Sequence, residues 1–267
     1  MVKKQKEIIN LLDDIRDQSL FVHNDKLDGV SFSTEDFKKR DLYLVETLSI
    51  LNAIVHNGTM LLYGSHGGGK TTISKLLGQF LLNKTEDEIN KAILRGHPQL
   101  TEEKILGNLD FKQMLSPELI PDDGDIDVKW NEFVLSEWKI IDEVNRLSHY
   151  TQNILLSLLA EGVVKYHNQS REVRQFSVFA TMNPPDAGNV DLPIPFLDRF
   201  AIAVPITMPD YSSLKTIGKE NSFQKNNNIR SLPDGFITEV REDVETIEFS
   251  RDAEQFINNL ISDFGLC

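Results

Sequence analysis

The chain has 267 residues, of which 41 are acidic and 28 are basic, so its formal net charge at pH 7 is −13. This charge argues against general binding of nucleic-acid phosphates, and the length suits one large α/β domain with a small appendage. The single cysteine, Cys267, excludes a disulfide framework. No stretch has the pattern of a signal peptide or the roughly 18 apolar residues of a membrane span, so we expect a cytoplasmic protein without a membrane partner.

Apolar periodicity predicts two amphipathic helices near the start of the chain, over residues 6–18 and 41–56. The first is expected to dock on the surface of the domain, and the second to lead into a strand at 60–63. Strands and helices then alternate: a helix at 71–82, an acidic turn at 85–88, strands at 92–94 and 138–141, a helix at 150–161, a hairpin at 163–176, and strands at 176–182 and 201–204. Strands separated by helices indicate a mainly parallel sheet whose ligand lies at the carboxyl ends of the strands.

A glycine-rich loop follows the strand at 60–63. Its sequence, GSHGGGKT at residues 64–71, matches the phosphate-binding pattern G-x-x-x-x-G-K-[ST] between a strand and a helix. Glycines let backbone N–H groups approach a polyanion closely, and Lys70 is expected to reach the β- and γ-phosphates. A chance glycine-rich turn is the alternative, which the strand and the helix disfavour. The sequence therefore predicts an ATP site formed by Gly64, Ser65, His66, Gly67, Gly68, Gly69, Lys70, Thr71 and Thr72, with the Thr71 hydroxyl offered to Mg²⁺.

Two adjacent carboxylates end the apolar strand at 138–141. Asp142 is expected to hold Mg²⁺ through its water shell, and Glu143 to polarise an attacking water. A small-molecule kinase also uses a phosphate loop, but it needs a pocket for an acceptor substrate and no water-activating glutamate. Glu143 therefore favours hydrolysis.

Two further polar residues follow strands or short helices. Asn183 ends the strand at 176–182, where its amide is expected to hold the attacking water or a γ-phosphate oxygen. Taken alone, Asn-Pro after a strand is more often a turn signal. Arg199 lies in the sequence LDRF at 197–200, at the end of a short helix before the strand at 201–204. Asn183 and Arg199 are candidates for catalysis because they follow the phosphate loop and the Asp-Glu pair in this order along the chain.

Four ordered motifs resemble those of MoxR-type AAA+ ATPases, which are akin to the motor subunits of magnesium and cobalt chelatases. They are the phosphate loop, IIDEVNR at 140–146, ATMNP at 180–184 and LDRF at 197–200. The resemblance covers roughly residues 40–205. It implies a three-layer α/β/α P-loop core with a mainly parallel five-stranded sheet, an insert in the second helix at about 97–127 and a hairpin at about 163–176.

The same resemblance implies how such a core would work. It implies a hexameric ring that hydrolyses ATP, in which Arg199 is an arginine finger for the nucleotide of the neighbouring subunit. It also implies a protein client, and it suggests clients that carry a von Willebrand A domain.

Two departures from the family pattern stand out. The loop lacks the usual proline and contains His66, which is expected to contribute its backbone rather than its ring. No G-x-S-x-R segment, which would carry the sensor 2 arginine, occurs before Cys267. We therefore expect a core at 1–206, a linker at 207–236 and a truncated or degenerate helical lid at 237–267.

These observations predict an ATP-hydrolysing machine that remodels a protein partner. A nucleic-acid or restriction-type motor is the first alternative, which the acidic total disfavours and which a basic cluster favours: Lys165, His167, Arg171 and Arg174. An ordinary solvated hairpin explains that cluster equally well. A nucleotide-gated scaffold with weak turnover is the second alternative, because the predicted lid is incomplete.

Overall fold

The computed structural model describes residues 2–17, 44–115, 126–173, 175–184, 191–207 and 231–264. A five-stranded sheet lies at its centre with the strand order β2-β5-β8-β1-β9. All neighbouring strands in this sheet run parallel, which confirms the predicted α/β class. The strands are β1 (Gly58–Gly64), β2 (Ile93–Arg95), β5 (Trp138–Asp142), β8 (Ser177–Met182) and β9 (Ile202–Ile206).

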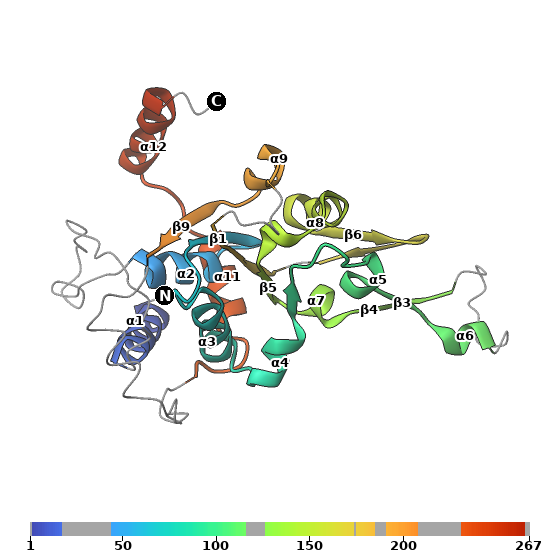
Figure 1. Cartoon of the computed structure of the whole chain (residues 1–267). Helices are drawn as coiled ribbons and strands as arrows, with labels where there is room; N and C mark the ends of the chain where they lie inside the picture. The colour runs from blue at the N-terminus through green and yellow to red at the C-terminus, as the bar shows by residue number, and fades with distance from the viewer. Residues whose placement is uncertain are drawn as a thin grey trace.

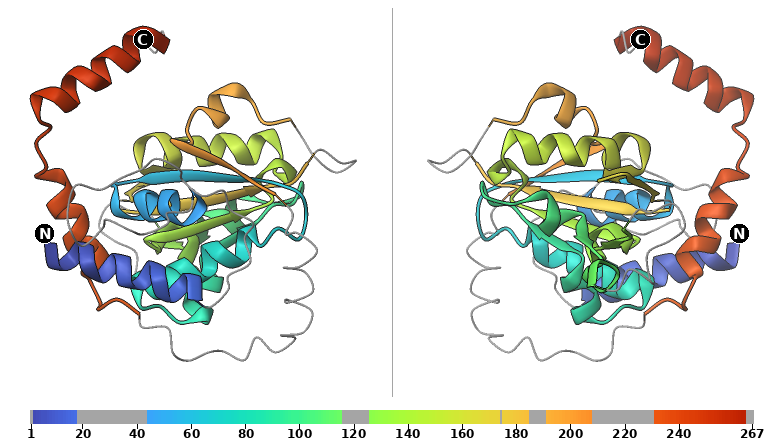
Figure 2. Two further views of the ribbon diagram at one scale, coloured as in Figure 1. Left: turned by 90° about the vertical axis from the view of Figure 1, so that its left-hand side faces the viewer. Right: turned by 90° about the vertical axis from the view of Figure 1, so that its right-hand side faces the viewer.

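Helices cover both faces of the sheet, so the core has three layers (Figures 1 and 2). One face is covered by α1 (Val2–Asp17), α2 (Leu44–Ile54), α3 (Lys70–Leu82) and α11 (Phe236–Glu245). The other face is covered by α5 (Glu102–Ile105), α7 (Glu132–Leu135), α8 (His149–Glu161) and α9 (Ile194–Leu197). Strands of a sheet covered on both faces are buried and mostly apolar, and β1, β5 and β8 are buried along most of their length.

Alternation along the strands divides the core in two. Met60 and Leu62 of β1 pack with α2 and α3, whereas Leu61 between them packs with α8 on the opposite face. Ile140 and Ile141 of β5 divide in the same way, because successive side chains of a strand point to opposite faces. All five side chains are at most 4% exposed, so each face has its own dry core.

The acidic turn predicted at 85–88 is instead the first turn of helix α4 (Glu86–Lys91). The Thr85 side chain accepts a hydrogen bond from the Glu88 N–H, and the Glu88 carboxylate accepts one from the Thr85 N–H. This reciprocal pair is a capping box, and it satisfies backbone donors that the first turn of a helix leaves free. The prediction was wrong because the Thr-x-x-Glu signal was interpreted as a turn.

Two antiparallel hairpins project from the same end of the sheet (Figure 1). One consists of β6 (Val163–Tyr166) and β7 (Gln169–Glu172), and the other of β3 (Gly107–Leu109) and β4 (Val128–Trp130), with α6 (Phe111–Leu115) after β3. The Gln169 side chain joins them: its amide donates to the Ile126 carbonyl at 3.2 Å and accepts from the Val128 N–H at 3.1 Å. The part of the predicted insert at 116–125 and Arg174 of the basic cluster lie outside the described residues.

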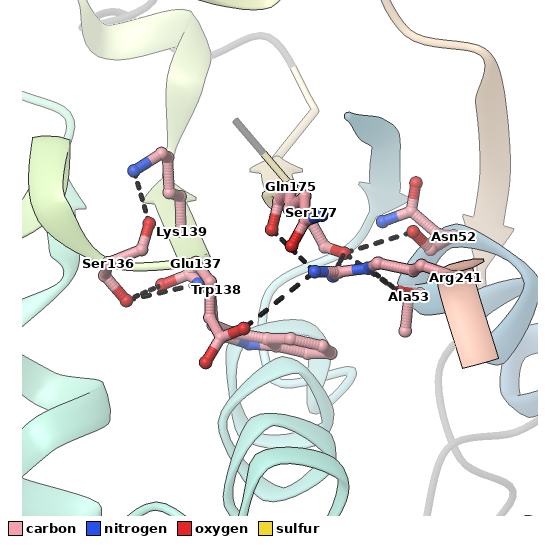
Figure 3. Close-up of polar contacts among 9 residues, drawn as sticks. All are labelled: Asn52, Ala53, Ser136, Glu137, Trp138, Lys139, Gln175, Ser177 and Arg241. Atoms are coloured by element: carbon pink, nitrogen blue, oxygen red, sulfur yellow. Dashed lines mark hydrogen bonds and ion pairs between the residues drawn. The ribbon is translucent and has the colours of Figure 1, made fainter. Parts of the chain in front are cut away.

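Two buried cations hold the amino ends of β5 and β8 (Figure 3). Lys139 of β5 is fully buried, and its ammonium donates to the carbonyls of Phe133, Val134 and Ser136 at 2.5–2.8 Å. Burial lowers the pKa of Lys139 to about 7. The three carbonyl acceptors oppose this effect, because they favour the charged form.

Arg241 of α11 is the second buried cation and is also fully buried. Its guanidinium donates to the Ala53 carbonyl at 2.9 Å, to the Gln175 carbonyl at 2.5 Å and to the Ser177 hydroxyl at 2.9 Å, and lies 3.9 Å from the Glu137 carboxylate (Figure 3). One side chain thus ties α11 to the end of α2 and to the starts of β5 and β8.

The last described helix, α12 (Arg251–Phe264), stands clear of the sheet in Figures 1 and 2. Most of the predicted linker lies outside the described residues, but Leu232 donates its N–H to the Phe80 carbonyl of α3 at 2.8 Å. The segment before α11 is therefore packed on the core, and the division into core, linker and lid stays a prediction. Within the described ranges, no helix combines the length and apolar character needed to cross a membrane.

Candidate nucleotide site

The glycine-rich loop connects β1 to α3 at the carboxyl end of the sheet. Gly67 and Gly69 both have φ +77°, in the left-handed region that favours glycine. Gly64 has φ +143°, and a Cβ there would lie 2.0 Å from the Ile206 carbonyl oxygen. A Cβ on Gly68 would lie 2.9 Å from the Ile206 side chain. The glycines thus allow both the turn of the loop and its close approach to β9.

The N-terminus of a long helix completes the loop. Helix α3 has 13 residues, and the Ile73 N–H in its first turn donates to the Gly69 carbonyl at 2.9 Å. The free N–H groups and partial positive charge at a helix start attract phosphate groups. Ser65, His66 and Thr72 are exposed beside it.

Lys70 is buried at the start of α3, although its side chain is charged. It is 6% exposed, and its ammonium donates to the carbonyls of Gly64 at 2.9 Å and Ser65 at 2.8 Å. Burial lowers the pKa of Lys70, and the nearby carboxylates of Asp142 and Glu143 oppose this shift. The loop therefore surrounds a cation with its own backbone.

Asp142 joins three elements at the carboxyl end of β5. Its Oδ1 atom accepts hydrogen bonds from the Thr71 hydroxyl of α3 at 2.6 Å and from the Thr181 hydroxyl of β8 at 2.8 Å. Its backbone carbonyl accepts from the Gly96 N–H at 2.6 Å. The predicted metal residues Thr71 and Asp142 thus lie in direct contact.

Both carboxylate oxygens of Glu143 have partners. Oε1 accepts from the Asn183 amide at 2.8 Å, and Oε2 lies 3.2 Å from Nη1 of Arg146. Asn145 in turn donates to the Asn183 carbonyl at 3.0 Å. Glu143 and Asn183, which were predicted from separate motifs, therefore form one hydrogen-bonded pair between neighbouring strands.

Arg199 stands apart from these contacts. Its side chain is exposed just after α9, and its backbone is the part that is held: its carbonyl accepts from the Thr59 hydroxyl at 2.6 Å. The same hydroxyl accepts from the Ala201 N–H at 3.0 Å. The structure thus brings together the predicted residues of the loop, β5 and β8, and leaves the Arg199 guanidinium at the surface.

Comparison with known proteins identifies the family of this site. The AAA domain (dynein-related subfamily) matches residues 59–200, which is more than half of the chain and includes all the motifs above. The chain belongs to this family. This match supports the resemblance of the motifs to those of MoxR-type AAA+ ATPases.

Two individual proteins, one compared by sequence and one by structure, are similar to this AAA domain protein. The uncharacterized protein YeaC of Bacillus subtilis (strain 168) is 26% identical over 187 residues, covering 65% of this chain and 49% of YeaC. The chain thus spans about half the length of this curated relative. A crystal structure from Cytophaga hutchinsonii, of a protein provisionally described as an ATPase, superposes with a TM-score of 0.66 at 22% identity. It covers 97% of this chain and 68% of the solved one, and at this identity it shows a shared fold.

Three residues of the AAA site were not predicted from the sequence. Thr181 of β8 lies two residues before Asn183, which directly follows the strand, so the alternation of side chains predicts that both point to the same face, and this spacing was an available signal. Arg146 lies three residues after Glu143, a spacing that a short helix brings together. Gly96 follows β2 closely, and a Cβ there would lie 2.0 Å from the Glu143 carbonyl oxygen. No local pattern marks that close approach.

The residues present fit a magnesium–nucleotide ligand. Among the described residues, no group of three or more His, Cys, Asp or Glu side chains could by itself hold a metal ion. Mg²⁺ in nucleotide sites usually takes only one or two protein oxygens and completes its shell with phosphates and water. Thr71 and Asp142, 2.6 Å apart beside the loop, match that requirement.

Proposed function

We propose that this AAA domain protein binds ATP and hydrolyses it to ADP and phosphate. The observation that carries the proposal is the hydrogen-bonded group at the ends of β5 and β8, formed by Asp142, Glu143 and Asn183 beside the loop residues Lys70 and Thr71. A binding loop alone would explain nucleotide affinity. A carboxylate paired with an amide in the neighbouring strand adds the groups that water activation needs.

The proposed binding step depends on Lys70. Its ammonium now contacts two loop carbonyls, at 2.8 and 2.9 Å, and these neutral acceptors are weaker partners than phosphate oxygens. We expect the β- and γ-phosphates of ATP to replace them. Thr71 and Asp142 would hold Mg²⁺, which supplies charge neutralisation on the phosphate oxygens when bound.

The proposed hydrolytic step depends on Glu143. A general base must have an oxygen within hydrogen-bond reach of the water it activates. Because Asn183 and Arg146 occupy one oxygen each, at least one of these contacts must open or be shared with the water. We expect Asn183 to orient that water, and its hydrogen bond of 2.8 Å to the same carboxylate supports this role.

We further propose that Arg199 acts in a neighbouring copy of the chain, within a hexameric ring. Its exposed side chain and held backbone support a role outside its own site. Energy from hydrolysis would then remodel a protein client, for which a partner with a von Willebrand A domain is the first candidate. This part of the proposal rests on the family resemblance and on Arg199.

The exposed hairpin favours a nucleic-acid motor as a second candidate. Lys165 of β6 pairs with Ser170, and Arg171 of β7 pairs with Val164. Lys165, Arg171 and His167 at the turn are all exposed. The net charge of −13 opposes that function, because a polyanion would be repelled by the rest of the molecule. A nucleotide-gated scaffold, which binds ATP but turns it over slowly, is the third.

One set of measurements separates these functions. ATP affinity is measured by titration, and phosphate release is measured with and without DNA. Lys70→Ala should abolish tight binding, whereas Lys75→Ala, a lysine change on the same helix, should not. A wild-type protein that binds no ATP would refute the proposal. Tight ATP binding without turnover would support the nucleotide-gated scaffold. Faster phosphate release in the presence of DNA would support the nucleic-acid motor.

A further inference from the structure

Thr181 is a buried polar side chain at the junction of the two acidic residues. It is 1% exposed, and the two residues before it on β8, Phe179 and Ala180, are fully buried. Its hydroxyl donates to Asp142 Oδ1 at 2.8 Å and accepts from the Glu143 N–H at 2.9 Å. A hydroxyl has one proton to donate, so these two bonds fix its orientation completely.

The Glu143 backbone explains why such a contact matters. Glu143 has φ 55° and ψ 56°, a left-handed conformation that a non-glycine residue adopts only where its surroundings hold it. The turn is held from one side by the Gly96 N–H, which donates to the Asp142 carbonyl at 2.6 Å. Thr181 holds it from the other side through the Glu143 N–H.

The same hydroxyl also fixes the carboxylate of Asp142. Oδ1 accepts from both Thr71 and Thr181, so the carboxylate plane is held from α3 and from β8 together. A serine would keep both bonds of Thr181, whereas a valine has nearly the same shape and can make neither. The hydroxyl can therefore be tested separately from the packing.

We propose that Thr181 is a positioning residue that aligns Asp142 for the metal ion and the Glu143 backbone for water activation. This role rests on the proposed ATPase function. It acts through Asp142 and Glu143, without contact to the substrate. Residues that orient metal ligands in this way commonly affect metal affinity or activity by about 10- to 100-fold when they are changed.

The test compares Thr181→Val with Thr181→Ser. Binding of a fluorescent ATP analogue is titrated in EDTA and in Mg²⁺, and kcat and KM are measured for ATP. For Thr181→Val we expect an affinity for the analogue in EDTA within about twofold of wild type. The gain in affinity on adding Mg²⁺ should be smaller by about tenfold, and kcat should be lower by about 10- to 100-fold. Thr181→Ser should restore both the gain in affinity with Mg²⁺ and kcat.

Thr151→Val is the matched control. Thr151 is a fully buried threonine on α8, and its hydroxyl donates to the Leu100 carbonyl at 3.2 Å, outside the site. The Thr151→Val variant should bind and hydrolyse ATP as the wild-type protein does. Thr181→Ala, which adds no atoms, gives the same readouts if the valine variant does not fold.

Three outcomes would overturn the role. They are a valine variant with wild-type kcat and Mg²⁺ dependence, an equal loss of affinity in EDTA and in Mg²⁺, and a serine variant as impaired as valine. A wild-type protein that neither binds nor hydrolyses ATP would instead refute the proposed ATPase function, and this role with it.

Discussion

Replacing Arg241 with alanine should destabilise the whole core. The change removes three hydrogen bonds, to Ala53, Gln175 and Ser177, in a region where the arginine is fully buried. Each buried acceptor left without a donor costs about 1–3 kcal/mol, so three acceptors at the lower end of that range give an expected loss of about 3–5 kcal/mol in the free energy of unfolding. The loss of the contact with Glu137 adds little, because that carboxylate is 36% exposed and 3.9 Å away.

Urea unfolding followed by circular dichroism measures this loss directly. For a domain of this size, the change corresponds to a decrease in Tm of about 10 °C. Arg251→Ala, at the exposed start of α12, is the matched control and should change stability by less than about 0.5 kcal/mol. Arg241→Lys should lie between them, because one ammonium cannot reach all three acceptors. A loss below about 1 kcal/mol for Arg241→Ala would refute the view that this contact network stabilises the fold.

The remaining predictions concern the proposed reaction. Lys70→Ala should abolish tight ATP binding in a fluorescence titration, because it removes a charge from the triphosphate itself. Glu143→Gln should keep that binding and lower the rate of phosphate release by about 10² or more, and Asn183→Ala should do the same with a smaller loss; normal hydrolysis by Glu143→Gln would contradict water activation. Arg199→Ala should lower the rate by about 10³ with binding nearly intact, and mixing it with Lys70→Ala subunits should restore part of the activity. Full activity of Arg199→Ala alone would exclude the arginine finger.

The sequence by itself determined the class of the fold and the parts of the site that follow strands. A phosphate loop is a contiguous pattern, and runs of apolar residues such as 138–141 predict buried strands directly. Because parallel strands end at the same edge of a sheet, the alternation of strands and helices was enough to predict that the ligand lies at the carboxyl ends of the strands, which Asp142 and Asn183 follow in the sequence. The contact between Asn183 and Glu143 agrees with that expectation.

Only the tertiary structure decided which polar side chains hold these elements in place. Arg241 bonds to Ala53 across 188 residues of sequence, and Thr181 bonds to Asp142 across 39. The Arg241 contact has no local signature, because the residues next to an arginine in the sequence do not show whether it is buried. The spacing of Thr181 before Asn183 indicates only a shared face, and it does not identify Asp142 as the partner. The strand order, which places β8 between β5 and β1, creates both environments. Burial then makes each unpaired polar group costly, and that cost selects the specific contacts seen here.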